Sequence, residues 1–290
     1  MQKQPGNKYC LTMNFLFKSF LSTVITAVIL IFTSIKADAQ RHEFGVFGGG
    51  SFYMGDLNPI MPFLSSRPAF GGLYRLNFDK HVSIRANVLR GYVKGDDALL
   101  KFNAERNLSF KSSITEISGQ LEVNFKPFLP GDKKNKKTPY LFGGFGVFKF
   151  NPKAQIDGEW YRLQPLGTEG QGTEAQADRD KYSLTAFSIL FGMGYKMNLT
   201  KRLTLCFEWG MRTTTTDYLD DVSTTYPSQS AMGEMNEVAR ILSDRSLTNQ
   251  GNNATYQRGN PSTKDWYSFA GIYLTYRLKD RVKYSCPTYN

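Results

Sequence analysis

Apolar and polar residues alternate one by one along much of the chain beyond residue 41. Around residue 120 the apolar positions share one parity, at Ile117, Leu121, Val123 and Phe125. The polar positions share the other parity, at Glu116, Gln120, Glu122 and Asn124. Such alternation predicts strands with one apolar and one polar face. Eight strands are predicted, at 42–55, 68–78, 82–93, 110–128, 139–150, 182–199, 203–213 and 265–278.

Two properties of these strands favour a barrel in the outer membrane over a soluble β-sandwich. Most of them are ten residues or longer, and transmembrane strands need roughly nine to eleven residues. Their polar faces combine arginines with carboxylates, which a small barrel can bury as a packed network of ion pairs. The residues predicted to form this lumen network are Arg75, Arg85, Glu116, Gln120, Glu122 and Glu208. We therefore expect an all-β, eight-stranded antiparallel up-and-down transmembrane β-barrel.

Both ends of the chain are expected to lie outside the barrel. The apolar segment "FLSTVITAVILIFTSI" follows Lys18 and is followed closely by "ADAQ". This arrangement predicts a secretory signal peptide at 1–39, cleaved between Ala39 and Gln40. The barrel is then expected at 40–278, with a C-terminal periplasmic tail at 279–290. After the signal peptide, no apolar run reaches the length that a transmembrane helix needs.

The connections between the predicted strands alternate between short and long, which is typical of outer-membrane barrels. We expect the short connections and both termini in the periplasm of a Gram-negative cell, and the long loops outside it. Basic residues gather in and beside the short connections, at Lys133, Lys134, Lys136, Lys137, Lys201 and Arg202. Two interpretations stay open: attraction to anionic lipid headgroups and docking of a periplasmic partner.

The residues offer little chemistry for an enzyme, a cofactor or a metal. The two histidines, His42 and His81, lie at the predicted periplasmic ends of strands and have no serine and carboxylate arranged around them. The net charge of +11 could suggest a nucleic-acid partner, but export argues against one. "TDYLDDVSTTY" at 216–226 holds Asp217, Asp220 and Asp221 without the spacing of an EF-hand. We interpret these aspartates as loop caps and turn formers, with a cation site as the alternative.

Three further segments are interpreted as structural. The glycine-rich "LGTEGQGTEA" at 166–175 carries Glu169 and Glu174, which would repel a phosphate. Residues 232–242 have apolar positions at helical spacing and are predicted to form one short helix on the barrel mouth. Cys206 is expected to point into the lumen, where a bridge to Cys286 in the tail is an alternative to two free thiols.

The stretch "FGVFGGGSFYMGD" at 44–56 could be mistaken for a phosphate-binding loop. Its glycines do not follow G-x-G-x-x-G, and Asp56, Asn58 and Pro59 prevent a helix from following. We interpret it as the first membrane strand. Its lipid-facing residues are expected to be Phe44, Val46, Phe52 and Met54. Small inward-facing residues, such as Gly45 and Gly49, would make room for larger side chains across a narrow barrel.

Five loop motifs occur in order along the mature chain: "GDLNP", "GDDA", "FNPKA", "LQPLGTEGQG" and "TDYLDDVST". Together they resemble the PorG family, the small outer-membrane barrels of the type IX (Por) protein secretion system of Bacteroidota. The resemblance covers residues 43–278. It implies a non-enzymatic barrel without a cofactor, which anchors a periplasmic ring built from a lipoprotein and its partner (PorK and PorN) to the outer membrane. If the protein works as the resemblance implies, the periplasmic ring docks on the basic residues of the short connections.

Two other functions remain open from the sequence. A surface-exposed binding or adhesion barrel would use the long loops, above all 213–264. A small diffusion channel would need an open lumen, whereas eight strands leave an interior that side chains just fill.

Overall fold

The computed structural model describes residues 41–278 except 60, 62, 64, 101 and 102. The predicted signal peptide at 1–39, the tail at 279–290 and Cys286 lie outside the described residues. None of the helices in the described part of the chain has the length and hydropathy to cross a membrane.

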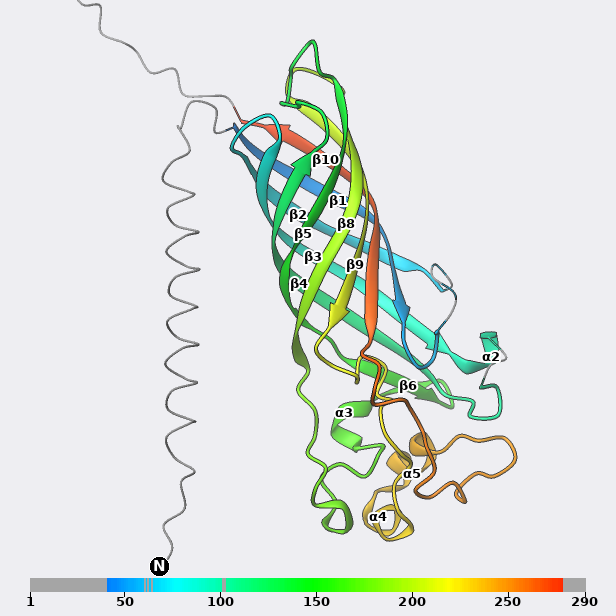
Figure 1. Ribbon diagram of the computed structural model, residues 1–290. Coiled ribbons are helices and arrows are strands. Elements are labelled where there is room, and N and C mark those ends of the chain that lie inside the picture. Colours follow the sequence, from blue (N-terminus) through cyan, green and yellow to red (C-terminus); the bar gives the residue numbers. More distant parts are fainter. Residues whose placement is uncertain (1–40, 60, 62, 64, 101–102, 279–290) are drawn as a thin grey trace, which may run out of the picture. The chain divides into compact units, whose positions relative to one another are not determined.

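Eight long antiparallel strands close into a barrel (Figure 1), as the alternation predicts. They are β1 Arg41–Met54, β2 Arg67–Asn77, β3 Val82–Asp96, β4 Ser109–Asn124, β5 Lys137–Lys149, β8 Thr185–Asn198, β9 Leu203–Thr214 and β10 Trp266–Arg277. Neighbours in the chain are neighbours in the barrel, and pairing of β1 with β10 and of β3 with β4 completes the ring. We call the end with the β2–β3, β4–β5 and β8–β9 connections the turn end, and the opposite end the loop end.

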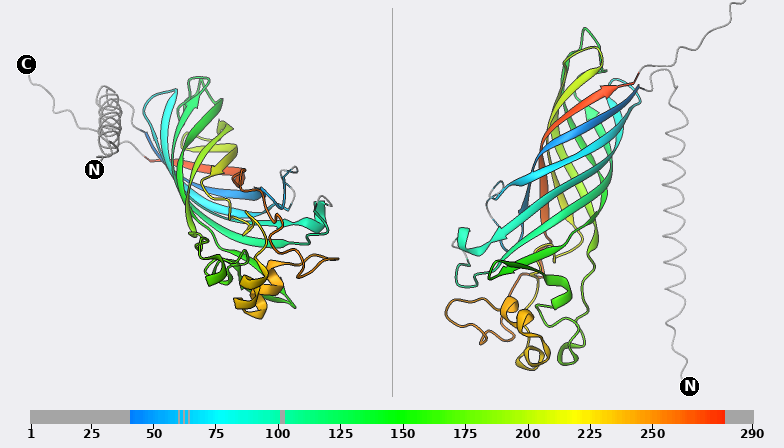
Figure 2. Two further views of the ribbon diagram at one scale, coloured as in Figure 1. Left: turned by 60° about the horizontal axis from the view of Figure 1, so that its bottom comes forward. Right: turned by 180° about the vertical axis from the view of Figure 1, so that it is seen from behind.

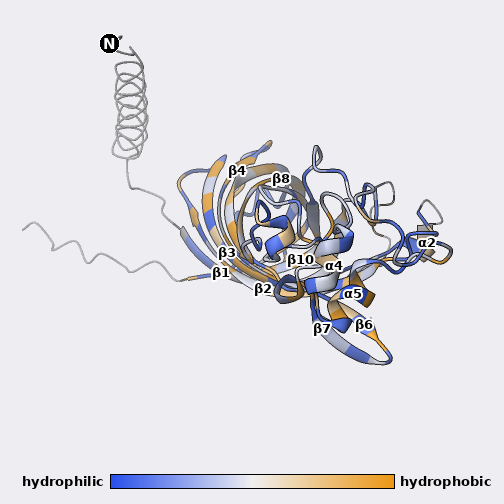
Figure 3. Ribbon diagram, turned by 90° about the horizontal axis from the view of Figure 1, so that it is seen from below, coloured by the Kyte–Doolittle hydropathy of each residue, from blue (hydrophilic) through white to orange (hydrophobic). Residues whose placement is uncertain are grey.

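The two faces of each strand differ as the sequence pattern predicts, and Figure 3 shows hydrophobic and hydrophilic residues alternating along the strands. One row of paired residues on the outer face consists of Val88, Ile117, Val147 and Phe187. These four side chains are 54%, 64%, 42% and 66% exposed, so this side of the barrel carries an apolar band that no other part of the described chain covers. Such an apolar band is what a lipid bilayer contacts.

The glycine-rich stretch forms β1. A Cβ at Gly49 would lie 2.2 Å from the carbonyl oxygen of Ala270, so this inward position accepts no side chain. Close approach of β10 is the reason, because Gly49 is paired with Gly271. Phe44 and Val46 are exposed on the outer face as expected, but Phe52 is buried because Phe63 from the β1–β2 loop packs on its ring at 4.5 Å. The expectation that Phe52 faces lipid is therefore wrong.

Strand limits differ from prediction by three residues or more at three places, one of which is the start of β8 at Thr185 rather than at residue 182. β4 ends at Asn124 rather than at residue 128, since Pro127 cannot donate to a ladder and the Phe128 N–H donates instead to the carbonyl of Lys80. β3 continues to Asp96, three residues beyond its predicted end, because its pairing with β4 continues to Ser109.

The connection 125–136 lies across the turn end of the barrel. Its buried residues are Phe128, Leu129 and Pro130. The Asn198 side chain donates to the carbonyl of Leu129 at 3.0 Å, and the Arg277 side chain donates to that of Pro130 at 3.0 Å. The connection therefore joins the ends of several strands and covers this mouth.

The long loops gather at the loop end and carry structure of their own (Figure 2). β6 Pro152–Ile156 and β7 Glu159–Arg162 form a hairpin that pairs with β4 and was not predicted. The short helices are α2 Asp97–Leu100, α3 Leu163–Leu166, the 3₁₀ turn Glu174–Gln176, α4 Gln229–Glu234 and α5 Glu237–Ser243. The prediction of a single helix at 232–242 is thus wrong, because two helices, α4 and α5, occupy this segment. The chain is extended at Met235, and the side chain of Asn236 caps a second helix by accepting from the N–H of Ala239.

Candidate functional site

The lumen is organised around the carboxylate of Glu122. It lies 2.9 Å from Nε of Arg75, 2.9 Å from Nη1 of Arg85 and 2.5 Å from Nζ of Lys196, and all four side chains are buried. Three cations from three strands thus meet one anion from a fourth strand.

Further ion pairs extend this cluster and balance its charge. Arg85 also pairs with Glu208 at 2.6 Å and donates from Nε to Gln120 at 2.7 Å. Arg75 pairs with Glu43 at 3.3 Å, and Arg212 pairs with Glu116 at 3.1 Å. The interior therefore holds four cations (Arg75, Arg85, Lys196, Arg212) and four anions (Glu43, Glu116, Glu122, Glu208).

Aromatic rings occupy the space between these charges. The guanidinium of Arg85 lies 4.7 Å from the ring centre of Phe142 and 5.3 Å from that of Tyr273. The hydroxyl of Tyr140 donates to Glu208 at 2.7 Å. Buried ions that are paired, bonded and stacked in this way form a packed interior rather than a water-filled pore. Glu43 and Lys196 were not selected from the sequence, although they lie on the inward faces of predicted strands.

At the loop end, Glu169 holds two distant loops together. Its carboxylate accepts hydrogen bonds from the N–H groups of Ser223 at 2.9 Å and Thr224 at 3.1 Å, and lies 3.2 Å from the Arg258 guanidinium. Arg258 is itself buried and donates to the carbonyl of Asp221 at 2.6 Å. The glycine-rich segment is therefore a structural clasp between the β5–β8 and β9–β10 loops.

Arg106 makes a similar set of contacts next to Arg258. It donates to both oxygens of Asp97, at 2.8 and 2.7 Å, to the carbonyl of Asp56 at 3.0 Å and to that of Arg258 at 2.6 Å. Asp56 in turn accepts from the N–H of Asn260 at 2.8 Å. Residues of "GDLNP", "GDDA", "LQPLGTEGQG" and "TDYLDDVST" thus meet in one buried network, which we call the loop cap. Arg106 and Arg258 belong to no motif, so the sequence alone did not point to them.

The aspartates of the loop cap act as hydrogen-bond acceptors in its turns. Asp220 accepts from the N–H of Val222 at 2.9 Å and from the hydroxyl of Tyr53, and Asp265 accepts from the N–H of Leu219 at 2.9 Å. Burial, reinforced by neighbouring carboxylates, raises the pKa of Asp220 and of Asp265 well above the ordinary range of a carboxyl. Burial also raises the pKa of Asp217 and of Asp221 to about 6.

Among the described residues, no group of three or more histidines, cysteines and carboxylates has an arrangement that could hold a metal ion. His42 Nδ1 lies 2.6 Å from the hydroxyl of Tyr74, and His81 Nδ1 lies 3.1 Å from the carbonyl of Asn124. Cys206 is buried in the lumen, and burial is the environment that keeps a thiol unreactive.

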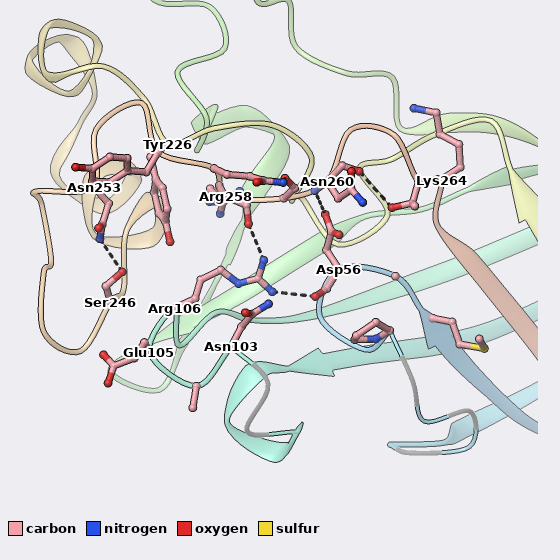
Figure 4. A pocket seen from close by; sticks show the side chains of 18 of the residues that line it. Asp56, Asn103, Glu105, Arg106, Tyr226, Ser246, Asn253, Arg258, Asn260 and Lys264 are labelled. Atoms are coloured by element: carbon pink, nitrogen blue, oxygen red, sulfur yellow. Dashed lines mark hydrogen bonds between the residues drawn. The ribbon is translucent and has the colours of Figure 1, made fainter.

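A cavity of about 1040 Å³ lies beside the loop cap (Figure 4). Its polar wall includes Asp56, Arg106, Tyr226, Asn253 and Lys264. Its apolar lip is formed where β1, β9 and β10 end, by Met54, Met211 and Trp266. The cavity is therefore amphipathic and lies between the barrel rim and the long loops.

The basic residues predicted for docking lie at the turn end. Lys133, Lys134, Lys136, Lys137, Lys201 and Arg202 are all exposed. Gly131 brings the connections together, because a Cβ on it would lie 2.3 Å from the carbonyl oxygen of Lys201. Within the described residues none of these six side chains forms an ion pair; Arg202 donates to the hydroxyl of Tyr276 at 3.1 Å. We call these six residues the basic rim.

Solved outer-membrane barrels resemble the chain at low sequence identity. The β-barrel domain of OprF from Pseudomonas aeruginosa is 10% identical over 82% of this chain and 100% of that chain, with a TM-score of 0.34. Ail of Yersinia pestis, solved with the heparin analogue sucrose octasulfate, is 9% identical over 82% and 100%, with a TM-score of 0.38. Neisserial surface protein A (NspA) is 7% identical over 82% and 97%, with a TM-score of 0.40.

No curated protein matches the chain. A family described as a domain of unknown function, DUF6089, matches residues 22–239, which is most of the chain, and the protein belongs to this family.

Proposed function

We propose that this protein is a non-enzymatic, non-conducting outer-membrane barrel of a type IX secretion machine, which anchors a periplasmic ring of the PorK and PorN kind. The observation that carries the proposal is the separation of roles in the fold. Paired charges fill the lumen, so no ligand passes through it. The barrel therefore contacts other proteins at its two ends. One end presents an exposed basic rim that has no acidic partner within the described residues.

The orientation belongs to the same proposal. Short connections and chain ends at one end, and long structured loops at the other, are the arrangement of outer-membrane barrels with periplasmic turns. The basic rim then faces the periplasm. Lysines without an ion-pair partner attract an acidic protein surface and orient it. The packing of Gly131 against Lys201 joins the β4–β5 and β8–β9 connections into one basic surface.

The test is reversal of charge at the basic rim. Changing Lys133, Lys134, Lys136 and Lys137 to glutamate is expected to lower recovery of ring proteins with the tagged barrel by tenfold or more, since about 1 kcal/mol per charge is typical near an acidic surface. Two charge reversals at the loop end, Arg240→Glu with Lys181→Glu, are expected to leave recovery unchanged. Unchanged recovery and unchanged secretion in the rim variant would refute the docking role.

A second candidate function is favoured by the cavity beside the loop cap. A surface-binding barrel would use such an amphipathic recess, whose lining includes Ser246, Asn253 and Gln257. Replacing residues 246–257 with a short glycine linker separates the two functions. Loss of surface binding with normal secretion favours the binding role, whereas loss of secretion with intact surface binding favours the ring anchor.

A further inference from the structure

Four basic residues lie directly opposite one another on four adjacent strands. Lys94 of β3 is paired with Lys111 of β4, Lys111 with Lys153 of β6, and Lys153 with Arg162 of β7. Residues paired across antiparallel strands point to the same face of a sheet. The row therefore crosses the outer face of the sheet where the β6–β7 hairpin extends it.

A second pair of cations lies between this row and the apolar band. Arg90 and Lys149 flank Thr115 in one register row, and both are exposed. Two residues further toward the turn end is the row of Val88, Ile117 and Val147, which belongs to the apolar band. At about 3.3 Å per residue, the cations begin about 7 Å from the apolar band and end about 20 Å from it along the strand. A strand tilt of about 40° shortens these distances to about 5 and 15 Å along the membrane normal. Arg90 and Lys149 therefore lie at the depth of the headgroup layer, which is about 5–8 Å thick, and the row of Lys94 and Lys111 lies on its outer side.

Like charges placed directly opposite each other destabilise a sheet, so the row calls for a compensating anion. Lys94 has one within the chain, since it pairs with Asp96 at 3.1 Å. Within the described residues, Lys111, Lys153, Arg162, Arg90 and Lys149 form no ion pair. The acidic residues of the hairpin are at its tip, where Asp157 is exposed and Glu159 accepts from the hydroxyl of Tyr161 at 2.6 Å.

The hairpin also fixes one of the cations. The ammonium of Lys111 lies 3.1 Å from the ring centre of Trp160 in β7, which is 39% exposed. Tryptophan is the residue that membrane proteins place at the lipid–water boundary. The pair therefore positions a charge and an amphipathic ring together on the loop-end side of the apolar band. Figure 3 shows the β6–β7 hairpin extending sideways from the barrel, where it can overlie the membrane surface.

We infer a binding site for the phosphorylated headgroup of a membrane lipid. It is formed by Lys111, Lys153 and Arg162, together with Arg90 and Lys149, which lie nearer to the apolar band. The lysines supply point charges and Arg162 a bidentate fork, both of which suit phosphate. Placement of the site in the outer leaflet rests on the orientation proposed above, so the lipid expected there is a phosphorylated glycolipid. The β6–β7 hairpin then contributes to recognition of the lipid headgroup.

The test uses the full mature chain, refolded in detergent, and native mass spectrometry with diphosphorylated lipid A. The wild type is expected to retain lipid A and to bind its dephosphorylated form at least tenfold more weakly. The variant K111Q/K153Q/R162Q is expected to lose lipid A binding about a hundredfold, at roughly fivefold per charge near an anionic surface. A matched control, K80Q/K126Q/R240Q, removes the same charge elsewhere on exposed positions and is expected to bind as the wild type does.

Other outcomes would overturn the inference. Equal binding of both lipid A forms by the wild type would do so without any variant, even if the triple variant failed to fold. Displacement of lipid A by millimolar inorganic phosphate would identify a site for a free anion, and retention of an acidic polypeptide in place of lipid A would identify a protein-binding surface. Labelling of a cysteine introduced at Gly158 on intact cells tests the orientation separately, so failure of lipid binding and failure of the orientation are distinguishable.

Discussion

The lumen and the loop cap are both buried and polar, yet they balance charge in different ways. In the lumen four cations face four anions, and each anion has a cationic partner. In the described loop cap two guanidinium groups, of Arg106 and Arg258, bond carboxylates, and the set of acids is larger. These acids are Asp56, Asp97, Glu169, Asp217, Asp220, Asp221 and Asp265. Hydrogen bonds from backbone and hydroxyl groups replace the missing cations. The difference predicts that the lumen network stabilises the barrel at all ordinary pH values, whereas the stability of the loop cap changes with pH.

The largest expected effect is loss of the central lumen anion. Glu122→Ala leaves Arg75, Arg85 and Lys196 close together without their shared carboxylate. Removing one partner from a buried ion pair costs about 3–5 kcal/mol. We expect the free energy of unfolding in urea, followed by the gel shift of the folded barrel, to fall by at least that amount. Glu159→Ala, at the exposed hairpin tip, is the control, and an equal stability for both variants would contradict a structural role of the lumen network.

Loss of a loop-cap cation should act only locally. Arg258→Met removes the ionic partner of Glu169 and a donor to the carbonyls of Asp221 and Ser243. We expect hydrogen exchange in residues 166–176 and 216–226 to accelerate about tenfold or more, because buried acceptors without partners cost about 1–3 kcal/mol. The barrel strands should keep their protection. Faster exchange throughout the barrel would show that cap and lumen are one cooperative unit.

The pH dependence should separate the two regions. The pKa of Asp221 rises from an ordinary carboxyl value to about 6 in the folded loop cap. Between about pH 4 and pH 6 the folded cap therefore binds more protons than the unfolded cap, and its stability falls as the pH rises through this window. The loss is on the order of 3 kcal/mol for a shift of about two units at this buried group. Above pH 6 the contribution stays at its lower level.

Hydrogen exchange of residues 216–226 at pH 4.5 and pH 7, corrected for the intrinsic rate, measures this loss. The double variant Asp217→Asn with Asp221→Asn, which carries no ionisable group at either site, should reduce the difference between the two pH values. A wild-type cap that is more protected at pH 7 than at pH 4.5 would give the opposite sign and refute the proposed cause.

The smallest expected signal is electrical. With the lumen filled by ion pairs and rings, and the connection 125–136 lying across the turn end, the wild type should show no steady openings in a planar bilayer. Removal of residues 216–226, which leaves the lumen intact, should not change this. Steady large openings of the wild type would show that the interior is a pore.

Parity alone was enough to identify the barrel and the inward position of Arg85 and Glu122, because every second side chain of a strand must point into a closed barrel. The same rule could have found Lys196. It could not find the loop cap, where Arg106 meets Arg258 across more than a hundred residues and no local pattern records the contact. The prediction of a single helix at 232–242 failed for a different reason, because it left out a local N-cap signal at Asn236. Apolar spacing was right, but the cap at Asn236 restarts the helix.

Closure of the barrel has a consequence for how the chain is made. Glu43 near the start of β1 is paired with Arg277 and accepts a hydrogen bond from Thr275 at 2.6 Å, although 232 residues separate the two. The first strand therefore cannot find its second neighbour until the last strand has been synthesised. Contacts of such long separation form slowly. The chain must be kept from aggregating while its ends are apart, and pairing of the last strand with the first closes the barrel.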